Sequence, residues 1–480
     1  MNKPLCCSLA VLLLGLQGCA VGPDFRRPQT PQVPAVFSAA AAAAEPLPVA
    51  DDAFWARFED PELTALVTAT LASNYSLLTA LANYDAANAL LRQAKFDQMP
   101  TVTASADARH QRLARDDAGA TARSQDRYAN QATLGWELDL FGRVRRSLEA
   151  QSSLAAARAD DLRALQVAVV GEVASTYIDL RAAQRMLVLA NANADSQRHT
   201  LAIVQQRLDA GRDARYDLDR AQAQLQAALA RVPAFEARIA VDKHRLSVLA
   251  GLAPAALDAR LARAMDMPQL PAAIAVGTPA DLLRRRPDVA AAEHQLHAAT
   301  ARVGVATADL FPRLSLGAAI GTAAFNGSEL YASGSGSSLA VLGIDWSFLD
   351  IGRVRSRIAA ADADAAGRLA AYQQTVLGAL EDVENALVRL SRSRQEYERL
   401  GQAAAGWRSA AVLADARYQS GAIELFELLE VQRSSYDASL QEADSQARTT
   451  ANAVGLFVSL AGGWPQTVPT RTTAPVPAAP

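Results

Sequence analysis

The sequence predicts a mostly α-helical, duplicated chain that also contributes four strands to a membrane β-barrel. Three observations predict this fold: a motif that returns after about 210 residues, four alternating segments of about ten residues, and two helical segments of about 67 residues. Aromatic residues make up only 6% of the chain and alanine is abundant, which favours long, closely packed helices over a bulky globular core.

The repeat is the strongest of these signals. Several landmarks return in the same order at nearly the same spacing, which is hard to obtain by chance. The paired landmarks are Trp136–Arg145 with Trp346–Arg355, Pro100 with Pro312, and Arg207–Gly211 with Arg417–Gly421. The chain is therefore expected to be a duplication.

Each repeat is expected to hold the same order of helices around its strands. The expected helices cover 61–98, 142–208 and 214–250 in the first copy, and 279–310, 352–419 and 424–460 in the second. A helix of about 67 residues spans roughly 100 Å, so the two shorter helices of each repeat, stacked end to end, should pair with the long one. Val169, Val173, Tyr177 and Leu180 recur at helical spacing as a packing face, and Pro233 should interrupt its helix.

Four segments alternate apolar and polar residues, as transmembrane β-strands do. In Gln131–Leu140 one face consists of Ala132, Leu134, Trp136, Leu138 and Leu140. The other three segments are Thr101–Arg109, Arg313–Gly321 and Leu339–Phe348. Loops are expected at 110–129 and 322–338, and Trp136 and Trp346 should lie at the periplasmic interface.

Four strands cannot close into a membrane barrel, whose smallest examples have about eight. Two chains would reach eight strands, with an interior filled by side chains, and three would reach twelve and leave a lumen. A channel built from this chain should therefore be at least a trimer. We found no segment after the N-terminal signal with the roughly 18 apolar residues of a transmembrane helix, so any membrane crossing should be made by the strands.

The N-terminus has the form of a secretory signal, with Lys3 followed by a short apolar stretch and small residues. Leu16–Cys19 resembles the lipobox of bacterial lipoproteins, in which the cysteine becomes the lipidated first residue. An ordinary signal peptide with an incidental cysteine is the alternative. Because Cys6 and Cys7 lie in the part that would be removed, Cys19 would be the one cysteine left, and acylation accounts for it. Since Ala20 is not aspartate, we expect the outer membrane.

These motifs resemble the outer-membrane factor family, specifically the TolC-like lipoproteins of the NodT type that serve resistance-nodulation-division efflux pumps. The matching stretches are Cys19–Phe25, Trp55–Phe58 with Asp60–Pro61, Trp136–Arg143, Pro279–Asp288, Leu310–Pro312 and Leu460–Trp464. The resemblance implies a homotrimer with a twelve-stranded barrel, a helical tunnel, a periplasmic adaptor protein and an inner-membrane pump that supplies the energy. A conduit for type I protein secretion is the alternative. The pump makes most of the choice of substrate.

The expected organisation follows from the repeat and the resemblance together. It divides the chain into 1–18 as signal peptide, 19–60 as lipidated N-terminus and linker, 61–250 as first repeat, 251–278 as linker, 279–462 as second repeat and 463–480 as C-terminal tail.

The resemblance also implies two kinds of site at the far end of the long helices. Glycine turns at Gly211 and Gly421, each shortly after an arginine (Arg207 and Arg417), would meet the adaptor. Rings of aspartate and leucine would close the tunnel. The gate candidates are Asp415, Leu413, Arg417, Tyr418 and Asp209.

Other site readings are weaker. His294 and His297 are three residues apart on an expected helix and could offer two metal ligands, but no third ligand is suggested, so we read them as solvated helix positions. Arg284–Arg286 is read as a helix-surface or subunit-packing run, not a nucleic-acid patch. No nucleophile elbow or phosphate loop is present in the sequence. We therefore expect no enzyme, no cofactor, no metal and no nucleic-acid partner.

Overall fold

The computed structural model describes residues 20–28, 33–38, 53–112, 114, 124–212, 214–271, 274 and 276–461. Cys19, the signal peptide and the tail at 463–480 lie outside these residues. The chain forms two compact units, and each combines segments from both repeats. Unit 1 comprises Met1–Gln29, Asn83–Ala159 and Ala291–Gln374, and unit 2 comprises Thr30–Ala82, Asp160–Ala290 and Thr375–Pro480.

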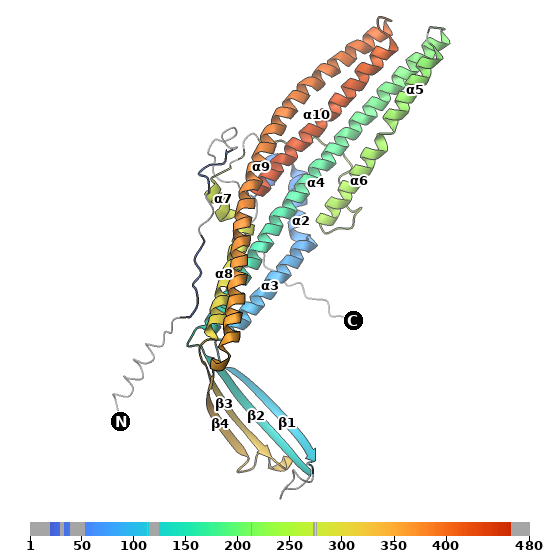
Figure 1. Ribbon diagram of the computed structural model, residues 1–480. Coiled ribbons are helices and arrows are strands. Elements are labelled where there is room, and N and C mark those ends of the chain that lie inside the picture. The colour runs from blue at the N-terminus through green and yellow to red at the C-terminus, as the bar shows by residue number, and fades with distance from the viewer. Residues whose placement is uncertain are drawn as a thin grey trace. The chain divides into compact units, whose positions relative to one another are not determined.

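The elements keep the order expected for a duplication (Figure 1). In the first half they are η2 (Phe54–Phe58), α2 (Pro61–Ser73), α3 (Tyr75–Phe96), β1 (Thr101–Arg112), β2 (Ser124–Leu138), α4 (Arg143–Asp209), α5 (Arg215–Leu229) and α6 (Val232–Leu249). In the second half they are α7 (Pro279–Arg285), α8 (Pro287–Ala308), β3 (Arg313–Ala324), η3 (Gly327–Glu329), β4 (Gly336–Asp345), η4 (Phe348–Asp350), α9 (Ile351–Gln419) and α10 (Leu425–Ser459). The long helices α4 and α9, of 67 and 69 residues, confirm the length read from the sequence.

The first helical segment of each repeat is broken, although the sequence predicts one continuous helix in each case. Asn74 ends α2 in extended conformation and caps α3, because its Oδ1 accepts hydrogen bonds from the backbone N–H groups of Ser76 (3.0 Å) and Leu77 (3.1 Å). Pro287 begins α8 and forces the residue before it out of helical conformation. The interruption expected at Pro233 is confirmed between α5 and α6.

The hydropathy of one segment corrects the expectation that no segment after the signal is apolar enough to cross a membrane. Pro61–Phe96 is long and apolar enough by composition, with a mean hydropathy of 1.3 over 18 residues. However, the break at Asn74 divides this segment into α2, of 13 residues, and α3, of 22 residues. Leu63, Leu66 and Val67 of α2 are instead buried in the core of unit 2.

Unit 1 holds one antiparallel sheet in the order β1-β2-β3-β4 (Figure 1). Residues directly opposite in neighbouring strands share a face of the sheet. The register aligns the apolar residues across strands in the rows Val102–Leu134–Ala318–Ala340, Trp136–Leu316–Leu342 and Leu138–Leu314–Ile344. The opposite face carries the rows Thr103–Thr133–Ala319–Leu339, Gly135–Gly317–Val341 and Glu137–Ser315–Gly343. In these rows one face is apolar, and the other is mostly small or polar, with Leu339 and Val341 as its large apolar residues.

The strand positions agree with the expected alternation, although their bounds differ. β2 begins at Ser124 because its pairing with β1 continues to Arg112, so part of the expected loop is strand. β4 ends at Asp345, which leaves Trp346 just beyond the strand. Trp136 and Trp346 nevertheless play matching roles, because each donates its indole N–H to a carbonyl that follows the preceding helix, Gln98 O and Leu310 O, both at 3.1 Å.

The repeated motif that follows β2 has a local structural purpose. Gly142 takes a φ of +84°, which side-chain-bearing residues adopt only at a cost. The carboxylate of Asp139 then accepts hydrogen bonds from the first N–H groups of α4, those of Val144 (3.1 Å) and Arg145 (2.9 Å). Arg143 Nε donates to Glu137 Oε1 at 2.8 Å. The motif therefore begins the long helix directly after the strand.

The core of unit 2 includes the packing face predicted on the long helix. Val169, Val173, Tyr177 and Leu180 are all buried, which confirms that reading of the period. The Tyr177 hydroxyl donates to Asp60 Oδ2 at 2.7 Å, and Asp60 also caps α2. Burial and this hydrogen bond raise the pKa of Tyr177, while Arg181 opposes the shift.

Asp242 on α6 is a half-buried carboxylate in an unfavourable position. Its Oδ2 is buried without a hydrogen-bond partner among the described residues. Burial raises the pKa of Asp242 to about 6; Arg238 opposes this shift and Asp179 adds to it. Arg238 is itself paired with Asp179 at 3.2 Å, so Asp242 receives little compensation.

We therefore expect Asp242→Asn to stabilise the protein at neutral pH. The folded chain holds this proton more tightly than the unfolded chain, so the charged form lowers stability as pH rises from about 4 to about 6, and the full cost is present above that range. Because the group is partly solvated, the gain should be at most about 1 kcal/mol. Thermal unfolding of detergent-extracted protein at about pH 7.5 and about pH 4 measures it. An equal gain at both values would contradict this assignment, and Asp179→Asn, which breaks an ion pair, serves as the contrasting variant.

Candidate functional site: the helical tip and the N-terminal segment

Two matched turns end the long helices within unit 2. Gly211 and Gly421 adopt φ values of +73° and +74°, which confirms that each turn needs its glycine. After α4, the N–H of Arg212 donates to Arg207 O (2.8 Å) and the N–H of Gly211 donates to Leu208 O (2.9 Å). After α9, Ala422 and Gly421 repeat this pattern with Arg417 O (2.8 Å) and Tyr418 O (3.0 Å). Both are Schellman caps, so the two turns are structural copies.

Behind the turns, four helices share a small apolar core. Tyr418 is 1% exposed and is the largest side chain of this core. The guanidinium of Arg207 lies over its ring, 4.8 Å from the ring centre, and so links α4 to α9. We call this set the tip core; its buried members are Val204, Leu218, Ala221, Ala414, Tyr418, Leu425, Leu428 and Leu429.

The candidate aspartates occupy related positions in the two repeats. Asp415 is half-buried, and its Oδ2 accepts a hydrogen bond from Gln419 Nε2 at 2.7 Å. Asp209 is exposed and accepts from Gln205 Nε2 at 2.8 Å. The order of aspartate and glutamine is therefore reversed between the copies, one turn of helix apart. Each carboxylate is held by its own helix.

The remaining gate candidates separate into buried and exposed ones. Leu413 is 63% exposed, and Arg417 is also exposed. The Arg417 guanidinium makes no hydrogen bond or ion pair with the part of the chain that the structure describes. Tyr418 and Arg207 thus hold the tip together within one chain, whereas Leu413 and Arg417 are available to other molecules. The sequence did not show this division, because it depends on the rotation of α9 against three other helices.

The segment that would follow the lipid anchor is held against the helices of unit 1. Arg146 on α4 is 4% exposed and donates to Asp24 Oδ1 (2.6 Å), Val21 O (3.3 Å) and Gly22 O (3.5 Å). It also donates to Glu149 Oε2 at 2.8 Å. Burial works against the charged form of Glu149, but hydrogen bonds from Arg146 and His297 lower the pKa of the Glu149 carboxyl. One buried guanidinium therefore fixes the backbone of the N-terminal segment.

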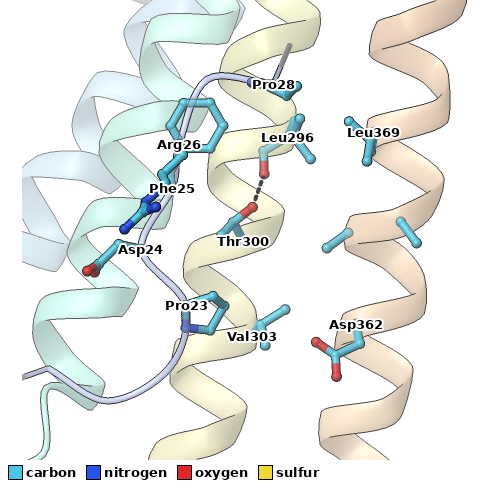
Figure 2. Close-up of a pocket in the computed structure, with 12 residues that line it drawn as sticks. Pro23, Asp24, Phe25, Arg26, Pro28, Leu296, Thr300, Val303, Asp362 and Leu369 are labelled. Atoms are coloured by element: carbon cyan, nitrogen blue, oxygen red, sulfur yellow. Dashed lines mark hydrogen bonds between the residues drawn. The ribbon is translucent and has the colours of Figure 1, made fainter.

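Figure 2 shows this segment running beside α8, with α9 across a groove of about 440 Å³. Phe25 stacks on His297, with ring centres 4.3 Å apart. Gly22 lies so close to α8 that a Cβ placed on it would be 2.4 Å from Gly304 Cα. The sequence offers a signal for the contacts of this segment, since Gly22, Asp24 and Phe25 belong to the Cys19–Phe25 motif that carries the resemblance.

These contacts correct two readings made from the sequence. His297 is not a solvated helix position, because its Nε2 is hydrogen-bonded to Glu149 Oε1 at 2.8 Å and its ring packs on Phe25. Arg286 is not a surface residue either; it is paired with Asp288 (2.7 Å) and Asp382 (3.0 Å). Both errors have one cause: Glu149 and Phe25 are far from His297 along the chain, as Asp382 is from Arg286, and local patterns do not reveal such partners.

A sheet with apolar rows on one face, two very long helices and matched turns at their ends are features expected of an outer-membrane channel. Comparison with known proteins agrees, because a family described as "Outer membrane efflux protein" matches residues 66–252 and 278–462. The chain belongs to this outer membrane efflux protein family, which confirms the resemblance seen in its motifs. Membership of this family places the protein in the outer membrane. Its members are transport proteins and not enzymes.

Individual relatives align over nearly the whole chain. The chain is 34% identical over 477 residues to outer membrane protein OprJ of Pseudomonas aeruginosa, and the alignment covers 97% of each protein. It is 32% identical over 434 residues to Nodulation protein T of Rhizobium leguminosarum bv. trifolii, covering 87% of this chain and 89% of the relative. Among solved structures, the outer-membrane channel OprN matches with a TM-score of 0.85 at 37% identity, over 93% of this chain and 100% of that one.

Proposed function

We propose that this protein is the outer-membrane channel of a tripartite efflux system and conducts substrates passively from a periplasmic adaptor and an inner-membrane pump to the exterior. The observation that carries the proposal is the sheet, whose register joins apolar residues of neighbouring strands into rows on one face, including one row, Val102–Leu134–Ala318–Ala340, that crosses all four strands. Relatives include OprJ and the solvent efflux pump outer membrane protein SrpC of Pseudomonas putida, 30% identical over 467 residues. These names favour efflux over the alternative of type I protein secretion.

The channel is a homotrimer with a twelve-stranded barrel under this proposal. β1 and β4 are the two ends of the strand order, so each leaves one edge unpaired in the described chain. Unpaired strand edges cannot be left in a bilayer, where no water satisfies their backbone groups. Pairing β4 of one chain with β1 of the next removes both edges, and three chains leave a lumen.

The adaptor docks at the tip, and the tunnel closes just before it. The two Schellman turns present Arg207, Gly211 and Gly421 at the ends of the helical hairpins. Asp415 stands one turn before Gln419 and is half-buried in a single chain. Three copies around the axis would place carboxylates close together, which favours cations and disfavours anions in the pore.

The proposal of a lipid anchor rests on the lipobox and on the segment that follows it, which Arg146 holds through Val21, Gly22 and Asp24. Cys19, with the signal peptide 1–18 before it, lies outside the described residues, but Ala20 and Val21 lie beside α4. Lipidation at Cys19 would attach this N-terminal segment to the membrane. The remaining divisions, with repeats at 61–250 and 279–462 separated by the 251–278 linker and followed by the 463–480 tail, belong to the same proposal.

Cys19→Ser is expected to abolish incorporation of labelled palmitate into the protein. Because several acyl chains anchor a protein firmly while the sheet also holds it in the membrane, assembly efficiency should fall more than membrane residence. Equal labelling of the variant would remove lipidation from the proposal. Cys6→Ser, within the signal peptide, is the matched control and should label as the parent does.

Asp415→Ala is expected to weaken the block of single-channel current by a trivalent cation added on the periplasmic side. Removing a ring of like charges removes the site that concentrates such ions. Asp195→Ala, which removes an exposed carboxylate of α4 that is not a gate candidate, is the matched control. Unchanged block in Asp415→Ala would return Asp415 to an ordinary helix-surface charge.

The experiment that tests the function itself is accumulation of a pump substrate in cells that lack this gene. Accumulation should rise on deletion and return to its original level when the intact chain is supplied. Loss of export of a secreted protein, with unchanged accumulation of small compounds, would favour the type I alternative.

A further inference from the structure

Unit 2 contains a basic cavity, and none of the gate candidates lines it. It has a volume of about 610 Å³ and is formed by α4, α10 and the segment 263–267. Three arginines line it, Arg181, Arg185 and Arg263, and the one carboxylate among the lining residues is Asp266. Three positive charges against one negative charge leave a net charge of +2.

Arg181 is the buried member of this group, at 2% exposure. Its guanidinium donates to neutral acceptors only: Gln184 Oε1 (2.8 Å), Arg263 O (2.9 Å), Tyr177 Oη (2.9 Å) and Met265 Sδ (3.5 Å). Its Nε is buried and has no hydrogen-bond partner among the described residues. A buried charge normally has a partner of opposite charge, because desolvation is otherwise costly.

Two other arginines with little exposure follow that rule, whereas half-buried Arg394 donates only to Pro271 O (2.9 Å) among the described residues. Arg146 is paired with Asp24 (2.6 Å) and Glu149 (2.8 Å), and Arg286 with Asp288 and Asp382. The carboxylate nearest to Arg181 through hydrogen bonds is Asp60, which is already engaged by Tyr177 and by two backbone N–H groups. Arg181 thus lacks the ion pairs that Arg146 and Arg286 have, and its charge is met only by neutral acceptors and by the Tyr177 ring, whose centre lies 4.7 Å from the guanidinium.

The two exposed arginines of the cavity also lack a partner of opposite charge within the described chain. Neither Arg185 nor Arg263 forms an ion pair with the described part of the chain, and neither does Asp266. Elsewhere on α4, Arg163 is paired with Asp160 at 2.6 Å. Arg181 and Arg185 are also four residues apart on one helix, an arrangement that repels by a few tenths of a kcal/mol. An anion between them would reverse that repulsion.

We propose that this cavity binds a small organic anion whose carboxylate or phosphate group lies on Arg181, Arg185 and Arg263. Guanidinium groups suit both oxyanions through paired N–H donors. The apolar part of the ligand lies against Val188, Met265 and Met267, which line the same cavity. The volume falls within the range of roughly 300–1,000 Å³ usual for small-molecule sites. This inference does not depend on the channel proposal.

Calorimetric titration of the detergent-extracted full-length protein with hexyl phosphate tests the proposal, at constant ionic strength. Saturable binding is expected, together with a rise in unfolding temperature of a few degrees, about 2–4 °C at saturating ligand. Inorganic phosphate should bind more weakly, because it lacks the apolar part. Equal binding of both phosphates would contradict a role of the apolar part and leave a site for the oxyanion group alone. Hexyltrimethylammonium, which carries the opposite charge, should not bind.

The variants separate the site from general charge effects. Arg185→Gln/Arg263→Gln should weaken hexyl phosphate binding at least tenfold while leaving the unfolding temperature without ligand unchanged, since both side chains are exposed. Arg181→Gln should abolish binding. Arg389→Gln removes a charge from an exposed position of α9 that does not line the cavity and should bind as the parent does. Absence of saturable binding to the parent, or equal weakening in Arg389→Gln, would overturn the proposal.

Discussion

Leu342→Arg is expected to prevent assembly of the protein in the outer membrane, whereas Val341→Arg is expected to permit it. The two residues are neighbours on β4 but lie on opposite faces: Leu342 is opposite Leu316 in an apolar row, and Val341 is opposite Gly317. An arginine on the lipid face costs about 2–4 kcal/mol at the bilayer midplane and less near the interfaces. A trimer carries this cost three times.

The measurement is the amount of heat-modifiable oligomer in the outer membrane, combined with accumulation of a pump substrate. Leu342→Arg should lose the oligomer and behave like the deletion. Val341→Arg should retain the oligomer, with altered ion selectivity, because small residues opposite Val341 leave room for the longer side chain. Equal loss in both variants would show that the two faces are not lipid and lumen.

Tyr418→Ala is expected to raise the resting conductance of the channel about tenfold or more, since a tenfold change in an equilibrium needs about 1.4 kcal/mol. Tyr418 is 1% exposed and fills the tip core beneath the Arg207 guanidinium. Truncating a buried aromatic residue costs about 3–5 kcal/mol, part of which would be lost from the closed arrangement of the hairpins. Planar-bilayer recordings measure the effect.

Tyr418→Phe is the matched control, because it keeps the ring and the cation–π contact. It should retain the low resting conductance of the parent. Arg417→Ala reports on another kind of contact: within the described chain its guanidinium is unpaired, so a rise in conductance would indicate a contact between subunits. Parental conductance in Tyr418→Ala would contradict a role of the tip core in closure.

The long helices and the strands could be predicted because their signals are local and repeated. α4 runs to Asp209 against an expected end at 208, and the apolar positions of Gln131–Leu140 fall on the face that the register confirms. Gly211 and Gly421 were recognisable as helix ends because glycine is favoured in the left-handed conformation that a Schellman cap requires.

The features that escaped prediction depend on long-range contacts. Asn74 looked like an interior helix residue, yet its side chain also donates to Leu249 O at 2.8 Å, which helps to fix the break between α2 and α3. The pairing of His297 with Glu149 joins α8 to α4, and Arg207 reaches Tyr418 across two repeats. Patterns of hydrophobicity do not encode such partners.

The number of chains in the detergent-extracted particle, measured by native mass spectrometry, tests the central claim most directly. Four strands with an unpaired edge on β1 and on β4 predict three chains per particle, because three complete twelve strands around a lumen. A particle of three chains is the expected result. A stable single chain, with its sheet still protected from amide exchange, would contradict the proposed channel.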